Sequence, residues 1–439
     1  MKSPDSRRVL LLQGPPTHFF GILRKAFADA GIPVVRVTLN AGDALRAAGE
    51  VVPYHGKLDD FAAFLTDLMQ REAITDVIYY ADRLPYHRIA EQVANRLGAT
   101  PYALENGYLR PDWLTLEPGG MGAFSRFPVE RAHVEAIAAE APPVDDTVRY
   151  RHSFPIEAFY DVSYTLTQVL TGYRYRHFER DRAHNPLREY FSWLPQLVRR
   201  YIAQRRGPGQ VSGVIATCKP FFFFPMQLQE DYQIRHNSRY DTLADLVDEV
   251  FASFARAAPA DAKLVVKIHP LDNGLQNWRK TLKKAKHEYG LTGRIKLIAG
   301  GPLVDLLGHC EGVVLVNSTV GLTALRHGCA LKTLGAAVYD LPGLTDNQPL
   351  DGFWQNPARP DPAYVETFVR ALAHATQLKG SFYHGEGMQE GAHEIVRRVA
   401  TGFGASGHFV TPPPRFARAD ELGITLDPPV GRARVPLKV

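Results

Sequence analysis

The sequence predicts an α/β protein of two doubly wound domains, each with a largely parallel sheet. Three observations lead to this class. The chain has 439 residues, which is too many for one ordinary hydrophobic core. Short apolar runs alternate with helical segments in the first hundred residues, and again from residue 221 onward. Several apolar runs end directly in polar residues, as strands do where a parallel sheet carries a ligand site.

The first domain is expected over residues 1–150. Its helices are predicted to end at Gly31 and Gly98, because glycine commonly terminates a helix. The loop Asn40–Asp43 follows the second strand, and residues 107–150 show no clear periodicity. Strands are predicted at 9–12, 34–39, 76–80 and 102–105, and helices at 19–30, 59–71 and 86–97.

A helical insertion is expected over 151–206, and Arg205–Gly209 is the predicted domain boundary. The second domain then covers 207–360, and helices with a proline-rich tail cover 361–439. In this domain Thr242 is a predicted helix N-cap. Its strands are predicted at 221–225, 264–268, 294–299, 313–316 and 331–334, and its helices at 242–257, 303–310 and 319–327.

Composition excludes several classes of protein. The net charge of +5 is too small to indicate nucleic acid by itself, but it fits an anionic substrate or membrane surface. Three cysteines without a Cys-x-x-Cys motif favour neither a disulfide framework nor a zinc site, so a reducing cytoplasm is expected. The first apolar run reads as a strand rather than a signal peptide, and no run of about 18 apolar residues predicts a membrane-spanning helix.

The most informative motif is Asn317, Ser318 and Thr319, which follow a buried strand and begin a helix of small residues. A helix N-terminus offers unpaired N–H groups and the positive end of the helix dipole, and the hydroxyls add donors. This motif therefore suits a phosphate. Lys267, His269 and Pro270 end a second strand, where a cation and an imidazole can hold a phosphate or assist a leaving group. The alternative is an ordinary strand end whose histidine bonds to the backbone.

Two carboxylates are candidates for catalysis. Asp231 follows an apolar strand among amides that include Gln227, so it can serve as a nucleophile or base. Its alternative role is to cap a helix. Glu105 ends a first-domain strand and is a candidate general acid/base. Arg110 lies in the same loop, and the alternative is that it simply pairs with Asp112 or Glu117.

Two further segments have open interpretations. Gln13, Gly14 and Pro15 follow the first strand and either line an acceptor site or form a plain turn; dinucleotide, Walker and His-Glu-x-x-His motifs are absent. The basic and aromatic stretch 172–206 either touches a membrane surface or lipid acceptor, or is a solvated helix face. It has no stacking module that would indicate nucleic acid.

At these residues the sequence resembles bacterial capsule polysaccharide biosynthesis proteins, namely the retaining β-Kdo glycosyltransferases of the KpsS/LipB type from ABC-transporter-dependent pathways. Short pieces such as His-Pro are weak signals, whereas the ordered set is specific. The matching segments are 11–16, 19–20, 40–43, 105–117, 227–231, 267–272, 316–321 and 335–344.

The resemblance implies a GT-B-like architecture, in which two Rossmann-like domains face each other across a cleft. It also implies that Kdo passes from CMP-β-Kdo to a (lyso)phosphatidylglycerol acceptor and starts the poly-Kdo linker of a capsule. By this resemblance Asp231 is the nucleophile, Glu105 the acid/base, and His269 stabilises the departing CMP. The donor-binding residues are Gln227, Lys267, His269, Pro270, Asn317, Ser318 and Thr319, and the acceptor-binding residues are Gln13, Gly14, Pro15 and Arg110.

The same resemblance implies no cofactor or metal, a cytoplasmic protein peripheral on the inner membrane, and contacts with other capsule biosynthesis or export proteins. Two positions depart from the pattern: Asn106 stands where a second acidic residue is expected, and Glu230 lies beside Asp231, which makes Glu230 the alternative nucleophile. The alternatives are a transferase that elongates an oligo-Kdo chain or uses another CMP-sugar, and a non-catalytic scaffold of capsule assembly or export.

Overall fold

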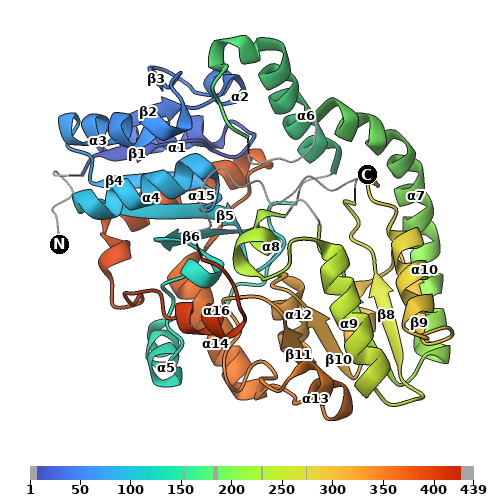
Figure 1. Ribbon diagram of the computed structural model, residues 1–439. Coiled ribbons are helices and arrows are strands. Elements are labelled where there is room, and N and C mark those ends of the chain that lie inside the picture. The colour runs from blue at the N-terminus through green and yellow to red at the C-terminus, as the bar shows by residue number, and fades with distance from the viewer. Residues whose placement is uncertain (1–6, 152–153, 181–185, 229–230, 273, 427–439) are drawn as a thin grey trace. The chain divides into compact units, whose positions relative to one another are not determined.

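The computed structural model describes residues 7–151, 154–180, 186–228, 231–272 and 274–426 (Figure 1). They form two compact units, which combine segments from both ends of the chain. The first unit contains residues 1–181 and 368–415, and the second contains 182–367 and 416–439. Each unit has its own sheet with helices packed on it, which confirms the α/β class. The segment 361–439, expected to be one C-terminal region, is divided between the two units.

The first unit is built on a seven-stranded sheet with the order β12-β6-β5-β4-β1-β2-β3. Strands β1 to β5 are parallel to their neighbours, whereas β6 pairs antiparallel with β5 and β12 antiparallel with β6. The strands are β1 Val9–Leu11, β2 Val34–Thr38, β3 Val52–Pro53, β4 Asp76–Tyr80, β5 Thr100–Asn106, β6 Trp113–Pro118 and β12 Gln377–Lys379.

Helices cover both faces of this sheet, because its buried strands are apolar on both sides. Side chains of β1 alternate: Leu11 packs with α1 and α15 on one face, and Leu10 packs with α3 and α4 on the other. The α-helices are α1 Phe19–Asp29, α2 Ala41–Leu45, α3 Phe61–Arg71, α4 Pro85–Leu97, α5 Arg131–Glu140, α6 Phe154–Thr171 and α15 Gly385–Ala400. Short 3-10 helices are η2 Leu58–Asp60, η3 Gly122–Phe124, η4 Gly172–Tyr175 and η5 Phe403–Ala405.

The second unit has a five-stranded, entirely parallel sheet with the order β11-β10-β7-β8-β9. Its strands are β7 Phe221–Pro225, β8 Lys263–Lys267, β9 Ile295–Ile298, β10 Gly312–Leu315 and β11 Ala330–Thr333. Its helices are α7 Pro186–Thr217, α8 Tyr232–Asn237, α9 Leu243–Ala257, α10 Trp278–Glu288, α11 Leu303–Leu307, α12 Val320–Arg326, α13 Leu350–Gln355 and α16 Phe416–Glu421, while α14 Pro362–Thr376 continues from this unit into the first.

Aromatic packing fills one face of the second sheet. The rings of Phe222 and Trp354 meet edge to face with centroids 5.0 Å apart, and Phe254 packs against the same indole at 5.2 Å. Helix α9 begins at the predicted N-cap, since Thr242 and Asp245 form a reciprocal capping box. These contacts fix the strands whose carboxyl ends carry the candidate site.

The predicted boundary at Arg205–Gly209 is wrong, because these residues lie inside the long helix α7. A Cβ atom on Gly207 would lie only 2.1 Å from the backbone nitrogen of Gly301. The glycine therefore permits close packing of a helix on a loop rather than marking a linker. Within 151–206, the described residues belong largely to α6, η4 and the first part of α7.

Candidate functional site

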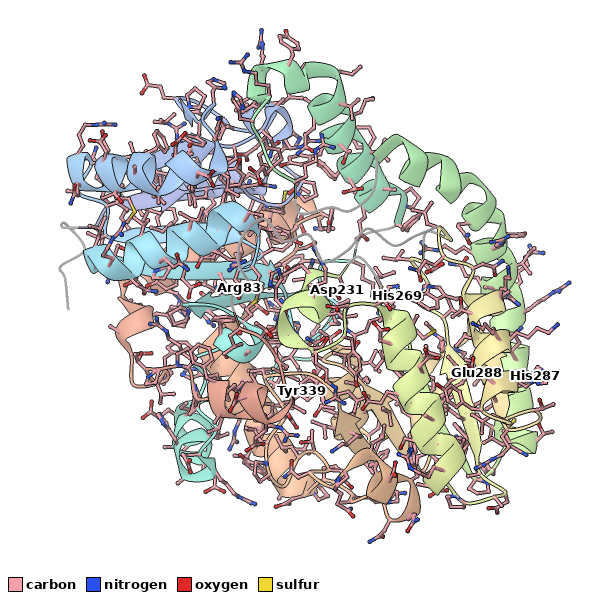
Figure 2. The ribbon with its side chains drawn as sticks, in the orientation of Figure 1. Arg83, Asp231, His269, His287, Glu288 and Tyr339 are labelled. Atoms are coloured by element: carbon pink, nitrogen blue, oxygen red, sulfur yellow. The ribbon has the colours of Figure 1, made fainter. Side chains whose placement is uncertain are left out.

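The second unit gathers most of the predicted donor-binding residues at one edge of its sheet. Strand β7 lies between β10 and β8, so the residues that follow these three strands are neighbours. Gln227 follows β7, Lys267 ends β8, and Asn317 follows β10. Figure 2 shows Asp231 at the start of α8 and His269 just beyond β8. The carboxyl edge of a parallel sheet is where α/β proteins commonly bind ligands.

Gln227 and Asn317 lock two of these strand ends together. The Gln227 Nε2 donates to Asn317 Oδ1 at 3.0 Å, and the backbone N–H of Asn317 donates to Gln227 Oε1 at 3.2 Å. The Asn317 Nδ2 donates in turn to the carbonyl of Gln233 at 3.2 Å, which fastens α8 over the same edge. The amide pair therefore positions α8 and Ser318.

Asp231 is the N-cap of α8, and its carboxylate accepts a hydrogen bond from the backbone N–H of Gln233 at 2.9 Å. This bond accounts for the aspartate as a capping residue, and it also orients the carboxylate as a nucleophile would require. Both interpretations therefore survive. Glu230, the alternative nucleophile, lies outside the described residues.

Lys267 and His269 form a partly buried basic pair. Burial lowers the pKa of Lys267. Burial, with the charges of Lys267 and Arg200, also lowers the pKa of His269 to about 4. The His269 Nδ1 accepts from the backbone N–H of Leu271 at 3.1 Å, so the neutral imidazole carries its proton on Nε2. At neutral pH this site offers an ammonium and a neutral N–H donor, and a dianion would favour protonation of the ring.

Ser318 and Thr319 start α12, as predicted. The Ser318 hydroxyl accepts from the N–H of Val320 at 3.2 Å, and the Ser318 carbonyl accepts from the Tyr339 hydroxyl at 2.5 Å. A Cβ on Gly321 would lie 2.4 Å from the Tyr339 ring, so this glycine serves packing. Helix α12 has only seven residues, which limits the contribution of its dipole. Pro270 is exposed beyond β8.

The first unit brings Gln13 and Glu105 to the carboxyl edge of its own sheet. They follow or end β1 and β5, which flank β4. The carbonyl of Gln13 accepts from the N–H of Tyr80 at 3.1 Å. Glu105 is hydrogen-bonded to the Tyr80 side chain, and burial together with the Glu105 charge raises the pKa of that phenol. Asn106 donates to Glu105 Oε1 through its backbone at 2.9 Å, which orients the carboxylate.

The predicted alternative for Arg110 is wrong, because both proposed partners are engaged elsewhere. Asp112 pairs with Lys379 at 3.0 Å. Glu117 accepts from the hydroxyls of Tyr108 at 2.8 Å and Ser125 at 2.5 Å, and burial raises its pKa to about 7. The charge of Arg110 instead acts on the phenols of Tyr80 and Tyr383, which places it near Glu105.

Gly14 and Pro15 are buried, in contrast to the half-buried Gln13. A Cβ on Gly14 would lie 2.6 Å from the Phe20 ring, and the backbone N–H of Gly14 helps to lower the pKa of the Asp43 carboxyl, which burial raises. Asp43 also forms a buried ion pair with Arg36 at 2.6 Å. Gly14 therefore has a packing role, and its predicted contact with an acceptor stays a prediction.

Four residues near these edges were not predicted. Tyr80 could have been found, since it ends a predicted strand next to the one that carries Glu105. Tyr339 falls inside the matching segment 335–344 but had no assigned role. Arg200 lies in the basic stretch 172–206 but had no role assigned at the donor site, and Tyr383 had no sequence signal. Tertiary packing brings them to His269 and Glu105 from distant segments.

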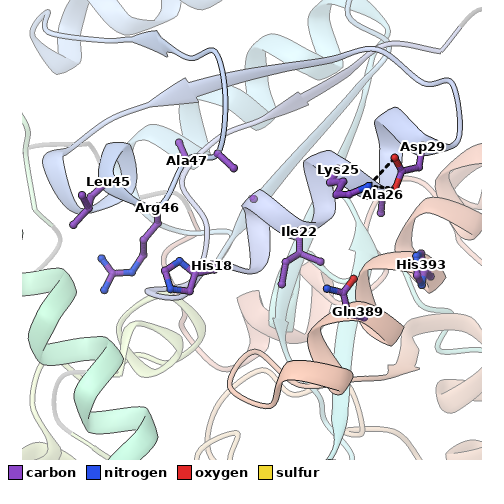
Figure 3. A pocket seen from close by; sticks show the side chains of 12 residues that line it. His18, Ile22, Lys25, Ala26, Asp29, Leu45, Arg46, Ala47, Gln389 and His393 are labelled. Carbon is purple, nitrogen blue, oxygen red and sulfur yellow. Dashed lines mark hydrogen bonds and ion pairs between the residues drawn. The ribbon is translucent and has the colours of Figure 1, made fainter.

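The first unit also has a pocket of about 510 Å³ along α1 (Figure 3). His18 and Arg46 lie at one end, and Lys25 and His393 line it further along. Lys25 is paired with Asp29 at 2.7 Å.

Among the described residues, no group of three or more His, Cys, Asp or Glu is placed to hold a metal ion. No helix within these ranges is long and apolar enough to cross a membrane.

Known proteins resemble this chain over most of its length. A family model described as capsule polysaccharide biosynthesis protein matches residues 75–383. The capsule polysaccharide export protein KpsS of Escherichia coli is 30% identical over 389 residues, which cover 86% of this chain and 97% of KpsS. The capsule polysaccharide modification protein LipB of Neisseria meningitidis serogroup B is 30% identical over 397 residues, covering 86% and 92%.

A solved structure also aligns with most of the chain. It is Thermosulfurimonas dismutans KpsC, described as a β-Kdo 2,7 transferase, with 15% identity and a TM-score of 0.44 over 89% of this chain and 99% of that one. The family model and the two relatives agree with the resemblance seen in the ordered motifs. This chain belongs to the capsule polysaccharide biosynthesis protein family.

Proposed function

We propose that this protein is a retaining glycosyltransferase that moves Kdo from CMP-β-Kdo to a phosphatidylglycerol-type lipid and so starts the linker of a capsular polysaccharide. One observation carries the proposal. In a chain of the capsule family, the basic pair Lys267 and His269 lies beside the Gln227–Asn317 amide pair at the carboxyl edge of a parallel sheet. That edge offers a cation, a neutral N–H donor and hydroxyls to one phosphate.

The leaving group in this proposal is CMP, which departs with the charge of a phosphate monoester. The Lys267 ammonium and the Nε2–H of His269 would stabilise the charge that develops on the phosphate oxygen. Ser318 and Thr319 would bind the nucleotide phosphate or the Kdo carboxylate. Pro270 would shape the rim of this site. The proposed reaction needs no metal, because these side chains meet the charge.

Asp231 would act as the nucleophile. Its carboxylate oxygen attacks the anomeric carbon, the bond to the CMP phosphate breaks, and a glycosyl–Asp231 ester forms with inversion. A second inversion occurs when the acceptor hydroxyl displaces Asp231, so the product keeps the donor configuration. The capping bond from Gln233 supports the first step, since it holds the carboxylate in one orientation.

Glu105 would accept the proton of the acceptor hydroxyl. The neighbouring Arg110 is exposed and near Tyr80 and Tyr383, and its charge suits the phosphate of a phosphatidylglycerol headgroup. Gln13, Gly14 and Pro15 would line the acceptor site from β1. This acceptor implies work at the cytoplasmic surface of the inner membrane, with other capsule biosynthesis or export proteins as partners and no role for nucleic acid.

Transfer assays separate this proposal from its rivals. The purified chain is mixed with CMP-Kdo, generated in place, and lysophosphatidylglycerol. A lipid product heavier by one Kdo supports the proposal. Turnover only with a soluble Kdo glycoside would assign an elongating enzyme, and turnover only with another CMP-sugar would change the donor. No turnover and no CMP binding would favour a non-catalytic scaffold.

A further inference from the structure

Helix α6 has its polarity reversed relative to an ordinary surface helix. Every exposed residue of its 18 is apolar, and the exposed fraction reaches 69% for Phe159 and 67% for Leu170. A soluble helix normally points its apolar stripe at the core and its charges at water. The large exposed side chains are Ile156, Phe159, Val162, Leu166, Val169 and Leu170.

The inner face of α6 is correspondingly polar. The Tyr164 hydroxyl accepts from Asn40 Nδ2 at 3.0 Å, and Ser163 accepts from the Arg46 guanidinium at 2.8 Å. The carboxylates of Glu157 and Asp161 act on the partly buried phenol of Tyr383, so they also face the body of the unit. Hydrogen bonds fix the rotation of the helix, and this rotation presents its apolar side outward.

We propose that the outer face of α6 docks this protein on a bilayer that contains anionic phospholipid. The helix is about 27 Å long at 1.5 Å per residue, so its stripe can lie flat in the interface. Burial of apolar side chains in the acyl boundary supplies affinity in proportion to their area. Contiguous exposed apolar surface of this kind marks an interaction site rather than ordinary surface.

Charge complementarity selects a bilayer as the occupant. Directly after α6, Tyr173 is 73% exposed and is followed by the exposed Arg174 and Arg176. The Arg174 guanidinium lies 5.9 Å from the centre of the Tyr173 ring. An amphipathic aromatic ring with arginines at the end of an apolar helix matches the headgroup zone of an anionic membrane.

The pocket along α1 adds polar groups beside α6. Arg46, which lines this pocket, bonds to α6, and the His18 ring lies 5.6 Å from that of Tyr160 in α6. Leu45, which is 71% exposed, borders the same pocket. A cationic and apolar lining next to an apolar helix suits headgroups at a bilayer surface.

The α6 surface also extends the proposed function, and it rests on that function for the delivery of the acceptor. The ring centroids of Tyr160 on α6 and Tyr383 lie 6.3 Å apart. The charges of Glu105 and Arg110 both act on the pKa of the Tyr383 phenol. Within the first unit, the docked helix and the candidate acceptor edge are therefore linked through two tyrosines.

The direct test is flotation of the full chain with vesicles of equal parts phosphatidylglycerol and phosphatidylcholine. The double variant Phe159→Ser/Leu170→Ser should bind at least about tenfold more weakly than the wild type. Val304→Ser is the matched control, because Val304 is also an exposed apolar residue but lies on α11. Equal binding by the double variant and the wild type, or equal loss in the control, would overturn the proposal.

A second readout does not depend on loss of binding. The three native cysteines, Cys218, Cys310 and Cys329, are buried, so Phe159→Cys supplies an accessible thiol for a polarity-sensitive dye. Its emission should shift to the blue when the same vesicles are added, whereas the dye on Val304→Cys should not respond. No shift at residue 159 would contradict docking through α6.

Two further measurements distinguish a bilayer from a second copy of the chain, and membrane docking from the proposed transferase activity. Dimerisation in sedimentation velocity without vesicles, abolished by Phe159→Ser/Leu170→Ser, would identify a second copy as the occupant and overturn the bilayer. Binding of CMP should be the same in this double variant and the wild type. If the wild type does not bind CMP at all, this result would count against the proposed transferase but not against membrane docking through α6.

Discussion

Gln227 and Asn317 exchange two hydrogen bonds, of 3.0 and 3.2 Å, between the ends of neighbouring parallel strands. The pair uses a side-chain donor in one direction and a backbone donor in the other. It fixes the turn that presents Ser318, and through Asn317 Nδ2 it also holds α8, which begins at Asp231. Hydrogen bonds through Asn317 therefore link the Ser318 turn to the helix that begins at Asp231.

Breaking this amide pair should weaken both the fold and donor binding. Gln227→Glu places an acceptor against Asn317 Oδ1, so the free energy of unfolding should fall by about 1–3 kcal/mol. The Michaelis constant for the CMP-sugar should rise. Urea denaturation and initial rates measure the two effects. A double-mutant cycle with Asn317→Ala should give a coupling of about 1 kcal/mol, and additive losses would contradict the pairing.

The two roles of Asp231 can be separated by substitution. Asn is as good an N-cap as Asp, so Asp231→Asn should keep the stability of the protein, whereas Asp231→Ala should lose about 1 kcal/mol. Both variants should lose transfer by at least about a thousandfold if the carboxylate is the nucleophile. Full activity in Asp231→Asn would leave only the capping role. Glu230→Gln is the control for the neighbouring carboxylate.

Donor binding should be linked to protonation of His269. Its pKa of about 4 in the free protein leaves the imidazole neutral at pH 7. A bound phosphate dianion favours the charged ring and raises that pKa, so binding should take up protons, and more of them at pH 6 than at pH 8. Calorimetry with CMP in buffers of different ionisation enthalpy measures this uptake. His269→Gln should reduce it, and an unchanged proton count in that variant would exclude His269 as the linked group.

Glu117 should make the protein less stable as the pH rises. Burial raises its folded pKa from 4.5 to about 7, so its contribution is fully present below pH 4.5 and is lost as the pH rises toward 7. Glu117→Gln can keep the bonds to Tyr108 and Ser125 without ionising. The variant should therefore gain up to about 3 kcal/mol over the wild type at pH 8, and little at pH 4. Denaturant unfolding measures the difference in the free energy of unfolding between the variant and the wild type. If this difference does not change with pH, the pKa of the Glu117 carboxyl is not raised in the folded protein.

The sequence predicts most of the parallel strands, because β1, β4, β7, β8 and β10 are short, mainly apolar runs that are largely buried on both faces. It misses the parallel strand β3, which has only two residues. It does not reveal β6, since Thr115 and Glu117 make that strand look polar. Their partners are distant or irregular: Thr115 accepts a hydrogen bond from Gln377, and Glu117 accepts bonds from Tyr108 and Ser125. Long-range satisfaction of buried polar groups cannot be seen in local periodicity.

The candidate site, like the fold, could be predicted only in part from the sequence. Gln227, Lys267 and Asn317 could be placed together from the sequence, because each follows or ends a strand of one parallel sheet. The reciprocal amide pairing, the depressed pKa of His269 and the position of Tyr383 could not. They depend on side-chain rotamers, burial and elements far apart in the chain.

One measurement tests the proposed transferase most directly. Mass spectrometry of the lipid and of the intact protein follows a reaction with CMP-Kdo and lysophosphatidylglycerol. The proposal predicts a lipid heavier by one Kdo and a Kdo adduct on the protein, both absent in Asp231→Asn. A lipid product formed at the wild-type rate by Asp231→Asn, or no product with any CMP-sugar and acceptor, would contradict it.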